Sequence, residues 1–322
     1  MTAVNARGSM QSYCVVDYSI TKHFAQVYVA ADYFLNKEGY MHFTELGKTG
    51  EKIPVIGQGT WGIKARKSKE YYEQWKKSLR HGIELGMTYI DTAEAYGWGI
   101  SERIVGEVVA EYDRDEVFVT SKLLPTHVRY SQMKKATEKS LKRLNLKYFD
   151  MYLIHFPNPL IPIKSNMRLL EELIAEGKTR YIGVSNHSLK KFQKAQECLK
   201  KAELVNSQLR VNVVRQRHII NHLLFYQKHG VTLNAYSPLG HRGLTNLKGE
   251  LRDNLEKIAK THNATIHQIA IAWLINMNGV ITIPKAFQLK HVEANAAASE
   301  IVLSDEEMNV ITESPIKVAH EI

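Results

Sequence analysis

Residues 89–97 read Tyr-Ile-Asp-Thr-Ala-Glu-Ala-Tyr-Gly, and this stretch decides the fold of the 322-residue chain. It places a carboxylate, Asp91, at the end of a short apolar strand and a phenol, Tyr96, five residues further on. Two later apolar runs end in a similar way, one on Lys122 and the other on His155. Polar side chains at the C-terminal ends of successive strands are typical of the active site of a parallel barrel. The four residues therefore predict one catalytic site at that end of a barrel.

The rest of the chain alternates short apolar runs with amphipathic stretches, the pattern of a parallel sheet with crossover helices. Eight strands are predicted, the number that closes such a barrel, at residues 55–59, 87–91, 117–120, 149–155, 181–184, 204–208, 232–236 and 280–283. Helices are predicted at 69–85, 101–112, 130–144, 163–176, 189–199, 217–229, 251–262, 266–277 and 289–299, and after a capping box at Ser304. The predicted fold class is α/β, a (β/α)8 TIM barrel, with a hairpin over residues 43–56 leading into the first strand.

Composition excludes several other classes of protein. With 44% hydrophobic and 24% charged residues the chain resembles a soluble globular protein, and it has no run of about 18 uncharged apolar residues. We therefore expect a cytoplasmic protein without a membrane partner. Its two cysteines, Cys14 and Cys198, support neither a disulfide framework nor a thiolate metal site, so no metal is expected. The net charge of +10 comes from bases spread over the predicted helices, which does not favour nucleic-acid binding.

Residues 1–40 differ from the remainder, because charged residues interrupt their apolar stretches and no basic start precedes a continuous apolar core. They do not read as a signal peptide. We expect a poorly ordered leader, or a translation start placed too early. The alternative is an added strand or helix that docks on the barrel and assists oligomerisation. Residues 41–322 are predicted to form one barrel domain, and the oligomeric state stays open.

From Met41 to Ser314 the chain resembles the NAD(P)H-dependent aldo-keto reductases. The motifs that carry the resemblance occur in order: Leu46-Gly-Lys-Thr-Gly, Gly57-Gln-Gly-Thr-Trp61, Asp91-Thr-Ala-Glu-Ala-Tyr96-Gly97, Ser121-Lys122, Leu153-Ile-His155, Gly183-Val-Ser-Asn186, Ala235-Tyr-Ser-Pro-Leu239 and Ile283-Pro-Lys285. The resemblance implies a barrel whose bottom is closed by the N-terminal hairpin. It also implies reduction of aldehydes or ketones, aldoses among them, to alcohols, and the reverse oxidation.

Reduction of a carbonyl needs a hydride on carbon and a proton on oxygen. No side chain donates a hydride, so a nicotinamide must supply it. By resemblance, Tyr96 donates the proton, and Lys122 beside it lowers the phenol's pKa from its ordinary value of ~10. Asp91 would pair with Lys122 and hold it. His155 would donate a hydrogen bond to the substrate carbonyl and orient it.

The resemblance also implies a cofactor site built on barrel loops, and the chain has no Gly-x-Gly-x-x-Gly turn of the Rossmann type. Ser185, Asn186 and Gln208 match the positions that bind the carboxamide, and Tyr236 matches the ring under the nicotinamide. The other implied cofactor contacts are Gly59, Thr60, Trp61 and Asp91 at the strand exits, Ser237, Leu239 and Gly240 along the pyrophosphate path, and Lys285, His291 and Asn295 at the adenosine end.

The choice between NADPH and NADH depends on a stretch that departs from the family pattern. Lys285 stands where the family places a cation against the 2′-phosphate, but His291 replaces the usual arginine. A lysine is a point charge without the bidentate fork of arginine, and a neutral histidine adds little attraction. Asn295 keeps the adenine position, whereas the usual preceding glutamate is displaced to Glu293. We predict that NADPH is preferred and that NADH is possible.

Substrate identity is the least constrained feature. Trp61 and Trp98, with His155, are predicted to wall the carbonyl pocket, and short loops favour broad aldehyde selectivity. Two other functions remain open. A Schiff-base aldolase would use Lys122 as an amine nucleophile. An NADPH-binding regulatory subunit, like relatives that act on membrane channels, would keep the nucleotide site with negligible turnover.

Overall fold

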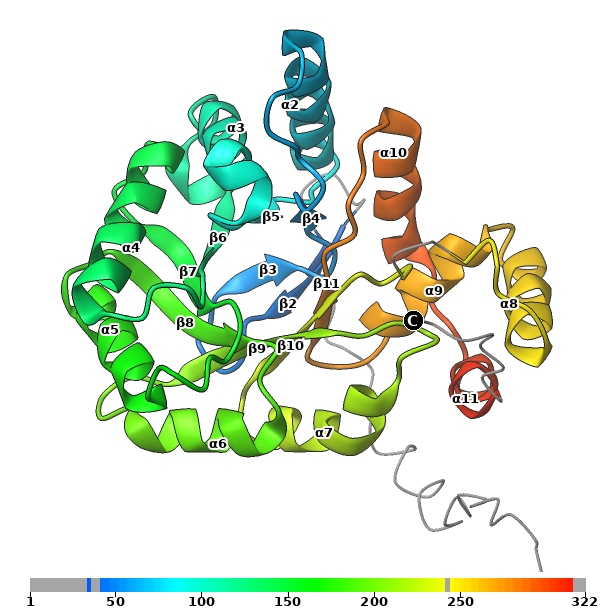
Figure 1. The fold of residues 1–322 in the computed structure, drawn as a ribbon. Coiled ribbons are helices and arrows are strands. Elements are labelled where there is room, and N and C mark those ends of the chain that lie inside the picture. Colours follow the sequence, from blue (N-terminus) through cyan, green and yellow to red (C-terminus); the bar gives the residue numbers. More distant parts are fainter. Residues whose placement is uncertain (1–33, 36–40, 241–243, 315–322) are drawn as a thin grey trace, which may run out of the picture.

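The computed structural model describes residues 34–35, 41–240 and 244–314. Its main sheet contains eight parallel strands surrounded by helices (Figure 1). In sheet order the strands are β11 (Val280–Thr282), β10 (Thr232–Tyr236), β9 (Leu204–Arg210), β8 (Thr179–Ser185), β7 (Phe149–Ile154), β6 (Phe118–Leu123), β5 (Tyr89–Asp91) and β4 (Gln58–Gly59). Backbone amides of Gly57 and Gly59 donate to Thr282 and Pro284, which joins the first strand to the last. The predicted (β/α)8 barrel is confirmed.

The helices around the sheet follow the predicted alternation. They are α2 (Lys69–Glu84), α3 (Ile100–Val109), α4 (Tyr130–Leu144), α5 (Ile163–Ala175), α6 (Leu189–Cys198), α7 (Arg217–Lys228), α8 (Glu250–Thr261), α9 (Ile266–Ile275), α10 (Leu289–Ala297) and α11 (Asp305–Glu313). The capping box predicted at Ser304 starts α11, with the Ser304 hydroxyl accepting from the Glu307 amide. Among the described helices, none is both long and apolar enough to cross a membrane.

The strands that carry the site are buried on both faces. Every residue of β6 and of β7 is buried, as expected when helices cover the outside of a parallel sheet and side chains fill its interior. Inside the barrel, Leu46 and Ile53 of the N-terminal hairpin pack with Met151 and Ile281 of the barrel strands. The interior is therefore a filled core, and only its C-terminal rim is free to build a site.

The N-terminal hairpin consists of β2 (His42–Glu45) and β3 (Lys52–Pro54), paired antiparallel. Its turn packs closely against the start of β10, because a Cβ on Gly47 would lie 2.4 Å from the carbonyl oxygen of Gly230. The Gly47 amide also donates to the Thr232 hydroxyl at 2.8 Å. Since only a glycine fits this approach, the hairpin is held at the N-terminal end of the barrel strands, as the resemblance implies.

A third strand extends this small sheet. β1 (Phe34–Leu35) pairs antiparallel with β2, in the order β1-β2-β3. The predicted hairpin did not include it. The predicted leader, residues 1–40, otherwise lies outside the described residues, so its remaining structure stays a prediction.

Candidate active site

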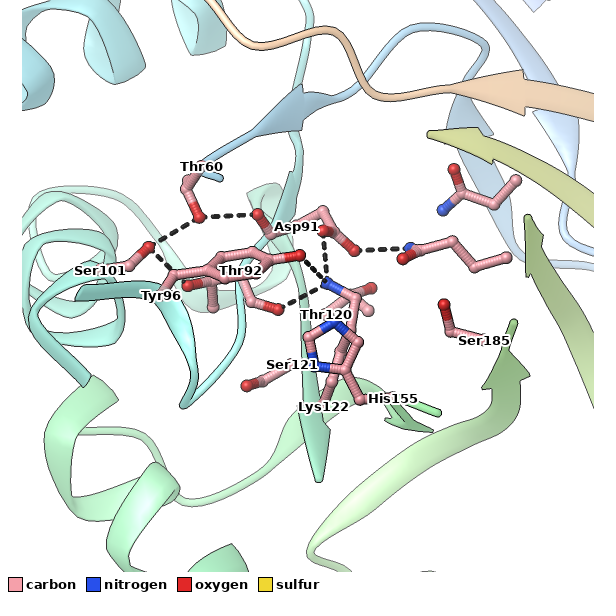
Figure 2. A network of polar contacts seen from close by, with 12 residues as sticks. Thr60, Asp91, Thr92, Tyr96, Ser101, Thr120, Ser121, Lys122, His155 and Ser185 are labelled. Atoms are coloured by element: carbon pink, nitrogen blue, oxygen red, sulfur yellow. Dashed lines mark hydrogen bonds and ion pairs between the residues drawn. The ribbon is translucent and has the colours of Figure 1, made fainter. Parts of the chain in front are cut away.

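Four predicted catalytic side chains converge at the C-terminal rim (Figure 2). Asp91 ends β5, Lys122 lies in β6, and His155 directly follows β7. Tyr96 begins the short 3-10 turn η1 (Tyr96–Gly99) between β5 and α3. In Figure 2 the Tyr96 hydroxyl points at the Lys122 ammonium, with the His155 ring alongside.

The centre of the site is a buried ion pair. Lys122 Nζ lies 2.5 Å from Asp91 Oδ1 and 2.8 Å from the carbonyl oxygen of Thr92. Burial lowers the pKa of Lys122 and raises that of Asp91, while the attraction between the two charges offsets part of both shifts. The second Asp91 oxygen accepts from Gln208 Nε2 at 2.7 Å. The ammonium is thus fixed by two oxygens and can turn its third proton towards Tyr96.

Lys122 Nζ lies 3.3 Å from the Tyr96 hydroxyl, and 4.9 Å from the centre of its ring. Burial, and next the negative charge of Asp91, raise the pKa of Tyr96 well above its ordinary value. The expected lowering of this pKa by Lys122 is not found, because the lysine charge is balanced by Asp91 and the phenol is desolvated. The phenol is therefore fully protonated at neutral pH, which is the form a proton donor needs.

His155 is an uncharged partner to the phenol. Its ring meets that of Tyr96 edge-on, with 5.8 Å between centres, and stacks on Phe156 at 4.7 Å. Burial, and then the positive charge of Lys122, lower the pKa of His155 to about 3. A neutral imidazole donates one N–H and accepts at its other nitrogen. The Nδ1 atom is buried without a hydrogen-bond partner among the described residues.

A chain of hydroxyl groups supports the turn that carries Tyr96. Ser101 Oγ donates to Thr60 Oγ1 at 2.7 Å and lies 2.8 Å from Thr92 Oγ1. Thr60 Oγ1 in turn donates to the carbonyl oxygen of Asp91 at 2.9 Å. All three hydroxyl residues are completely buried. They link β4, β5 and α3 directly behind Tyr96, as Figure 2 shows.

A buried carboxylate lies behind Lys122. Glu102 of α3 accepts from Ser121 Oγ at 2.7 Å and from Arg143 Nε at 2.6 Å. Burial raises its pKa, and the Arg143 guanidinium partly offsets that effect. Sequence reasoning did not single out Ser101 or Glu102. The sequence signal that could have identified both residues was their position in the first turn of the helix that follows Tyr96.

The residues predicted to hold the carboxamide lie together on neighbouring strands. Asn186, directly after β8, donates to Ser185 Oγ and to the carbonyl oxygen of His155, both at 3.0 Å. It accepts from the Tyr236 hydroxyl at 2.7 Å. Asn186 has a φ of 59°, a left-handed conformation that turns its side chain back towards the strand ends. These hydroxyl and amide groups, with Gln208, fit a carboxamide, which both donates and accepts hydrogen bonds.

The other predicted cofactor contacts follow the rim from β10 to α10. After β10, Ser237 and Gly240 have φ angles of 53° and 72° and flank Leu239, and a Cβ on Gly240 would meet only open space. The loop after β11 carries the exposed Lys285, and α10 carries the exposed His291 and the buried Asn295. The displaced carboxylate of Glu293 lies 3.0 Å from His81 Nε2 of α2.

On the β4 side, Gly59 is kept small by the neighbouring strand, because a Cβ would lie 2.6 Å from the carbonyl oxygen of Ile283. The predicted substrate-wall residues Trp61 and Trp98 are 56% and 87% exposed. Trp98 lines a pocket beside the Tyr96 turn, whereas Trp61 is not part of that lining. Within the described part of the chain, no group of three or more His, Cys, Asp or Glu side chains is placed to hold a metal ion.

A closed (β/α)8 barrel that gathers a phenol, a lysine–carboxylate pair and a neutral imidazole at its rim defines a barrel enzyme. The chain belongs to the aldo/keto reductase family, whose model matches residues 55–315. It is 35% identical over 261 residues to the methylglyoxal reductase of Escherichia coli K12, covering 80% of this chain and 90% of that one. The predicted family is thereby confirmed, and the protein is an NAD(P)H-dependent aldo-keto reductase.

Solved structures agree with this assignment. A thermostable aldo-keto reductase in complex with the inhibitor epalrestat is 41% identical, with a TM-score of 0.79, covering 84% of this chain and 98% of that one. An aldo/keto reductase from Klebsiella pneumoniae, in complex with NADP and acetate, is 35% identical with a TM-score of 0.75, covering 81% and 91%.

Proposed function

We propose that the protein reduces aldehydes and ketones, aldoses among them, to alcohols, with NADPH as the preferred cofactor and Tyr96 as the proton donor. The observation that carries this proposal is the position of Lys122 Nζ, 2.5 Å from Asp91 and 3.3 Å from the Tyr96 hydroxyl. A cation beside a protonated phenol is the arrangement that lets the phenol release its proton as negative charge develops on a carbonyl oxygen.

When bound, the nicotinamide would supply a hydride to the carbonyl carbon. The carbonyl oxygen then gains the electron pair of the broken π bond, and Tyr96 transfers its proton to that oxygen. The resulting phenolate lies beside the Lys122 ammonium, which stabilises it. In the reverse direction the same phenolate would take the proton from the alcohol.

His155 is suited to hold the carbonyl without competing for the proton. Because its pKa is lowered to about 3, it stays neutral at physiological pH and can offer an N–H to the substrate oxygen. Its ring lies edge-on to Tyr96, with 5.8 Å between the ring centres, which supports a role for both groups at one carbonyl oxygen. Asp91 acts through Lys122 and is a positioning residue.

Two comparisons support the substrate and cofactor classes. The similar Escherichia coli protein is named for reduction of methylglyoxal, a small dicarbonyl, and the similar Klebsiella pneumoniae structure contains NADP. Lys285 supports NADPH over NADH, because it is an exposed cation on the loop after β11, where the family holds the 2′-phosphate. The cytoplasmic location remains a prediction from the sequence.

The test is fluorescence titration of the full chain with NADPH and NADH, followed by absorbance-monitored oxidation of NADPH against aldehydes, ketones and aldoses. The proposal predicts tighter binding of NADPH and turnover of several small aldehydes. Tight binding without turnover would favour a regulatory NADPH-binding subunit. Borohydride trapping of substrate on Lys122, without any need for NADPH, would favour a Schiff-base aldolase.

A further inference from the structure

A pocket opens beside the turn that carries Tyr96. Its lining is formed by two short segments, residues 63–66 after β4 and residues 97–98 after Tyr96: Ile63, Lys64, Ala65, Arg66, Gly97 and Trp98. The two segments touch, because a Cβ on Gly97 would lie 2.8 Å from the carbonyl oxygen of Ile63. The pocket therefore borders the turn that directly follows Tyr96, at Gly97 and Trp98.

The pocket has a strong positive charge. Its lining includes Lys64 and Arg66, which belong to the basic stretch Lys64-Ala-Arg66-Lys67-Ser-Lys69 that leads from the β4–α2 loop into α2. In the described part of the chain, neither Lys64 nor Arg66 forms an ion pair with an acidic side chain. In the following helix, by contrast, Lys76 lies 2.6 Å from Glu107 of α3, and Arg80 lies 2.6 Å from Glu111, two residues after that helix ends. Cations without counterions beside an active site attract negatively charged ligands.

The loop is held in a fixed shape by two tyrosines of α2. The Tyr71 hydroxyl donates to the carbonyl oxygen of Gly62 at 3.0 Å and accepts from the Lys64 amide at 3.3 Å. The Tyr72 hydroxyl donates to the carbonyl oxygen of Lys64 at 3.2 Å and accepts from the Lys67 amide at 3.0 Å. Because these bonds fix the backbone between residues 62 and 67, Lys64 and Arg66 are presented from a preorganised loop.

Both sides of the pocket also carry backbone that L-residues rarely adopt. Arg66 and Trp98 have φ angles of 56° and 58°. A bulky residue in the left-handed region is uncommon, and such conformations gather at functional sites. Trp98 is 87% exposed, so no packing contact explains its placement at the pocket edge. The Trp98 indole provides an apolar wall of the pocket, and the opposite segment, residues 63–66, provides its positive charge.

We propose that this pocket binds the anionic group, a carboxylate or a phosphate, of the carbonyl substrate, so that the enzyme prefers acidic aldehydes to neutral ones of the same size. The inference rests on the proposed carbonyl reduction and specifies its substrate class. The substrate's apolar part would lie against Trp98 and its anionic end against Lys64 and Arg66, with the carbonyl directed towards Tyr96.

The test compares two matched substrate pairs with NADPH: 4-carboxybenzaldehyde against methyl 4-formylbenzoate, and glyceraldehyde 3-phosphate against glyceraldehyde. The proposal predicts a higher kcat/KM for the anionic member of at least one pair, and the pair that shows it distinguishes carboxylate from phosphate. In the double variant Lys64→Ala/Arg66→Ala, this preference should fall about three- to tenfold through KM, as expected for removal of two exposed cations. Added salt should reduce the preference of the unmodified enzyme by screening.

The control is Lys190→Ala/Lys194→Ala on α6, which removes the same charge from two exposed lysines of another face and should keep the preference. If kcat/KM in Lys64→Ala/Arg66→Ala falls equally for the anionic and neutral members, or if NADPH binding weakens in parallel, the two cations serve the cofactor. Either result would overturn the proposal. Equal turnover of both members by the unmodified enzyme would also overturn it, and would leave the reductase function intact. No turnover of any carbonyl would instead refute the reductase function, and this inference with it.

Discussion

Lys122 and Asp91 form an ion pair that is almost completely closed to solvent, with Nζ 2.5 Å from Oδ1 and side chains 0% and 2% exposed. Removing one partner of such a pair leaves an uncompensated buried charge, which costs about 3–5 kcal/mol. Hydrogen bonds from Lys122 to the carbonyl oxygen of Thr92 and from Gln208 to Asp91 reduce the desolvation penalty. The geometry thus keeps a cation beside the Tyr96 phenol.

Asp91→Asn should therefore lower the free energy of unfolding by about 3 kcal/mol, because Lys122 loses its counterion. The double variant Asp91→Asn/Lys122→Met should regain part of that stability while remaining inactive. Urea unfolding of the unmodified protein, of Asp91→Asn, of Lys122→Met and of the double variant gives the coupling energy between Asp91 and Lys122. Strictly additive losses would show that the pair does not hold Lys122 in place.

Ser101→Ala should remove the central hydroxyl of the group behind Tyr96. It would leave the Thr92 hydroxyl without its partner and remove the donor to Thr60, which keeps its bond to the Asp91 carbonyl oxygen, at a cost of about 1–3 kcal/mol. Because the turn that positions the phenol would loosen, kcat should fall more than the affinity for NADPH. Ser131→Ala, at an exposed position of α4, is the matched control. Unchanged stability and unchanged kcat in Ser101→Ala would contradict a positioning role.

Lys285→Ala should weaken NADPH binding by about tenfold, as loss of a charged hydrogen bond does, and should weaken NADH binding much less. His291→Arg should act in the opposite direction, since arginine adds a bidentate donor for a phosphate. Lys290→Ala, which removes an exposed cation at the start of α10, serves as the control for Lys285→Ala. If NADPH and NADH lose affinity equally, the 2′-phosphate is held elsewhere.

His155 should make the protein less stable in acid. Its folded pKa of about 3 lies below the value of 6.5 expected when unfolded, so below pH 6.5 the unfolded state takes up a proton that the folded state does not. The free energy of unfolding should then fall, near pH 5, by about 1 kcal/mol per pH unit from this residue alone. Comparing urea unfolding of the protein and of His155→Gln from pH 7 to pH 4 isolates this slope. Parallel pH curves would show that His155 is not buried in its neutral form.

Some of the fold is predictable residue by residue, and the reasons are local. β10 (Thr232–Tyr236) has the predicted bounds, because Gly230 and Ser237, both with positive φ, flank its apolar run. β6 (Phe118–Leu123) extends past the predicted end, since pairing with β7 continues through Leu123. β1 (Phe34–Leu35) lies in the stretch for which an added strand was only the alternative prediction, because two residues carry no periodicity, and it forms by pairing with β2.

The candidate site, too, could be predicted only in part. The meeting of Asp91, Tyr96 and Lys122 could be predicted, since each follows or ends a strand and parallel strands bring such ends together. The contact between Ser101 and Thr60 joins residues 41 apart in the chain and depends on how α3 packs, which no local pattern encodes. The pKa of Tyr96 was predicted in the wrong direction, because burial of the ring is a tertiary property that outweighs the nearby cation.

Tyr96 is the proposed proton donor. Tyr96→Phe removes one oxygen atom and keeps the ring, so the affinity for NADPH in a fluorescence titration should stay within about twofold of the unmodified protein, while the rate of aldehyde-dependent NADPH oxidation should fall by about a hundredfold or more. Turnover close to that of the unmodified protein would contradict this role of Tyr96 and require another proton donor at this rim.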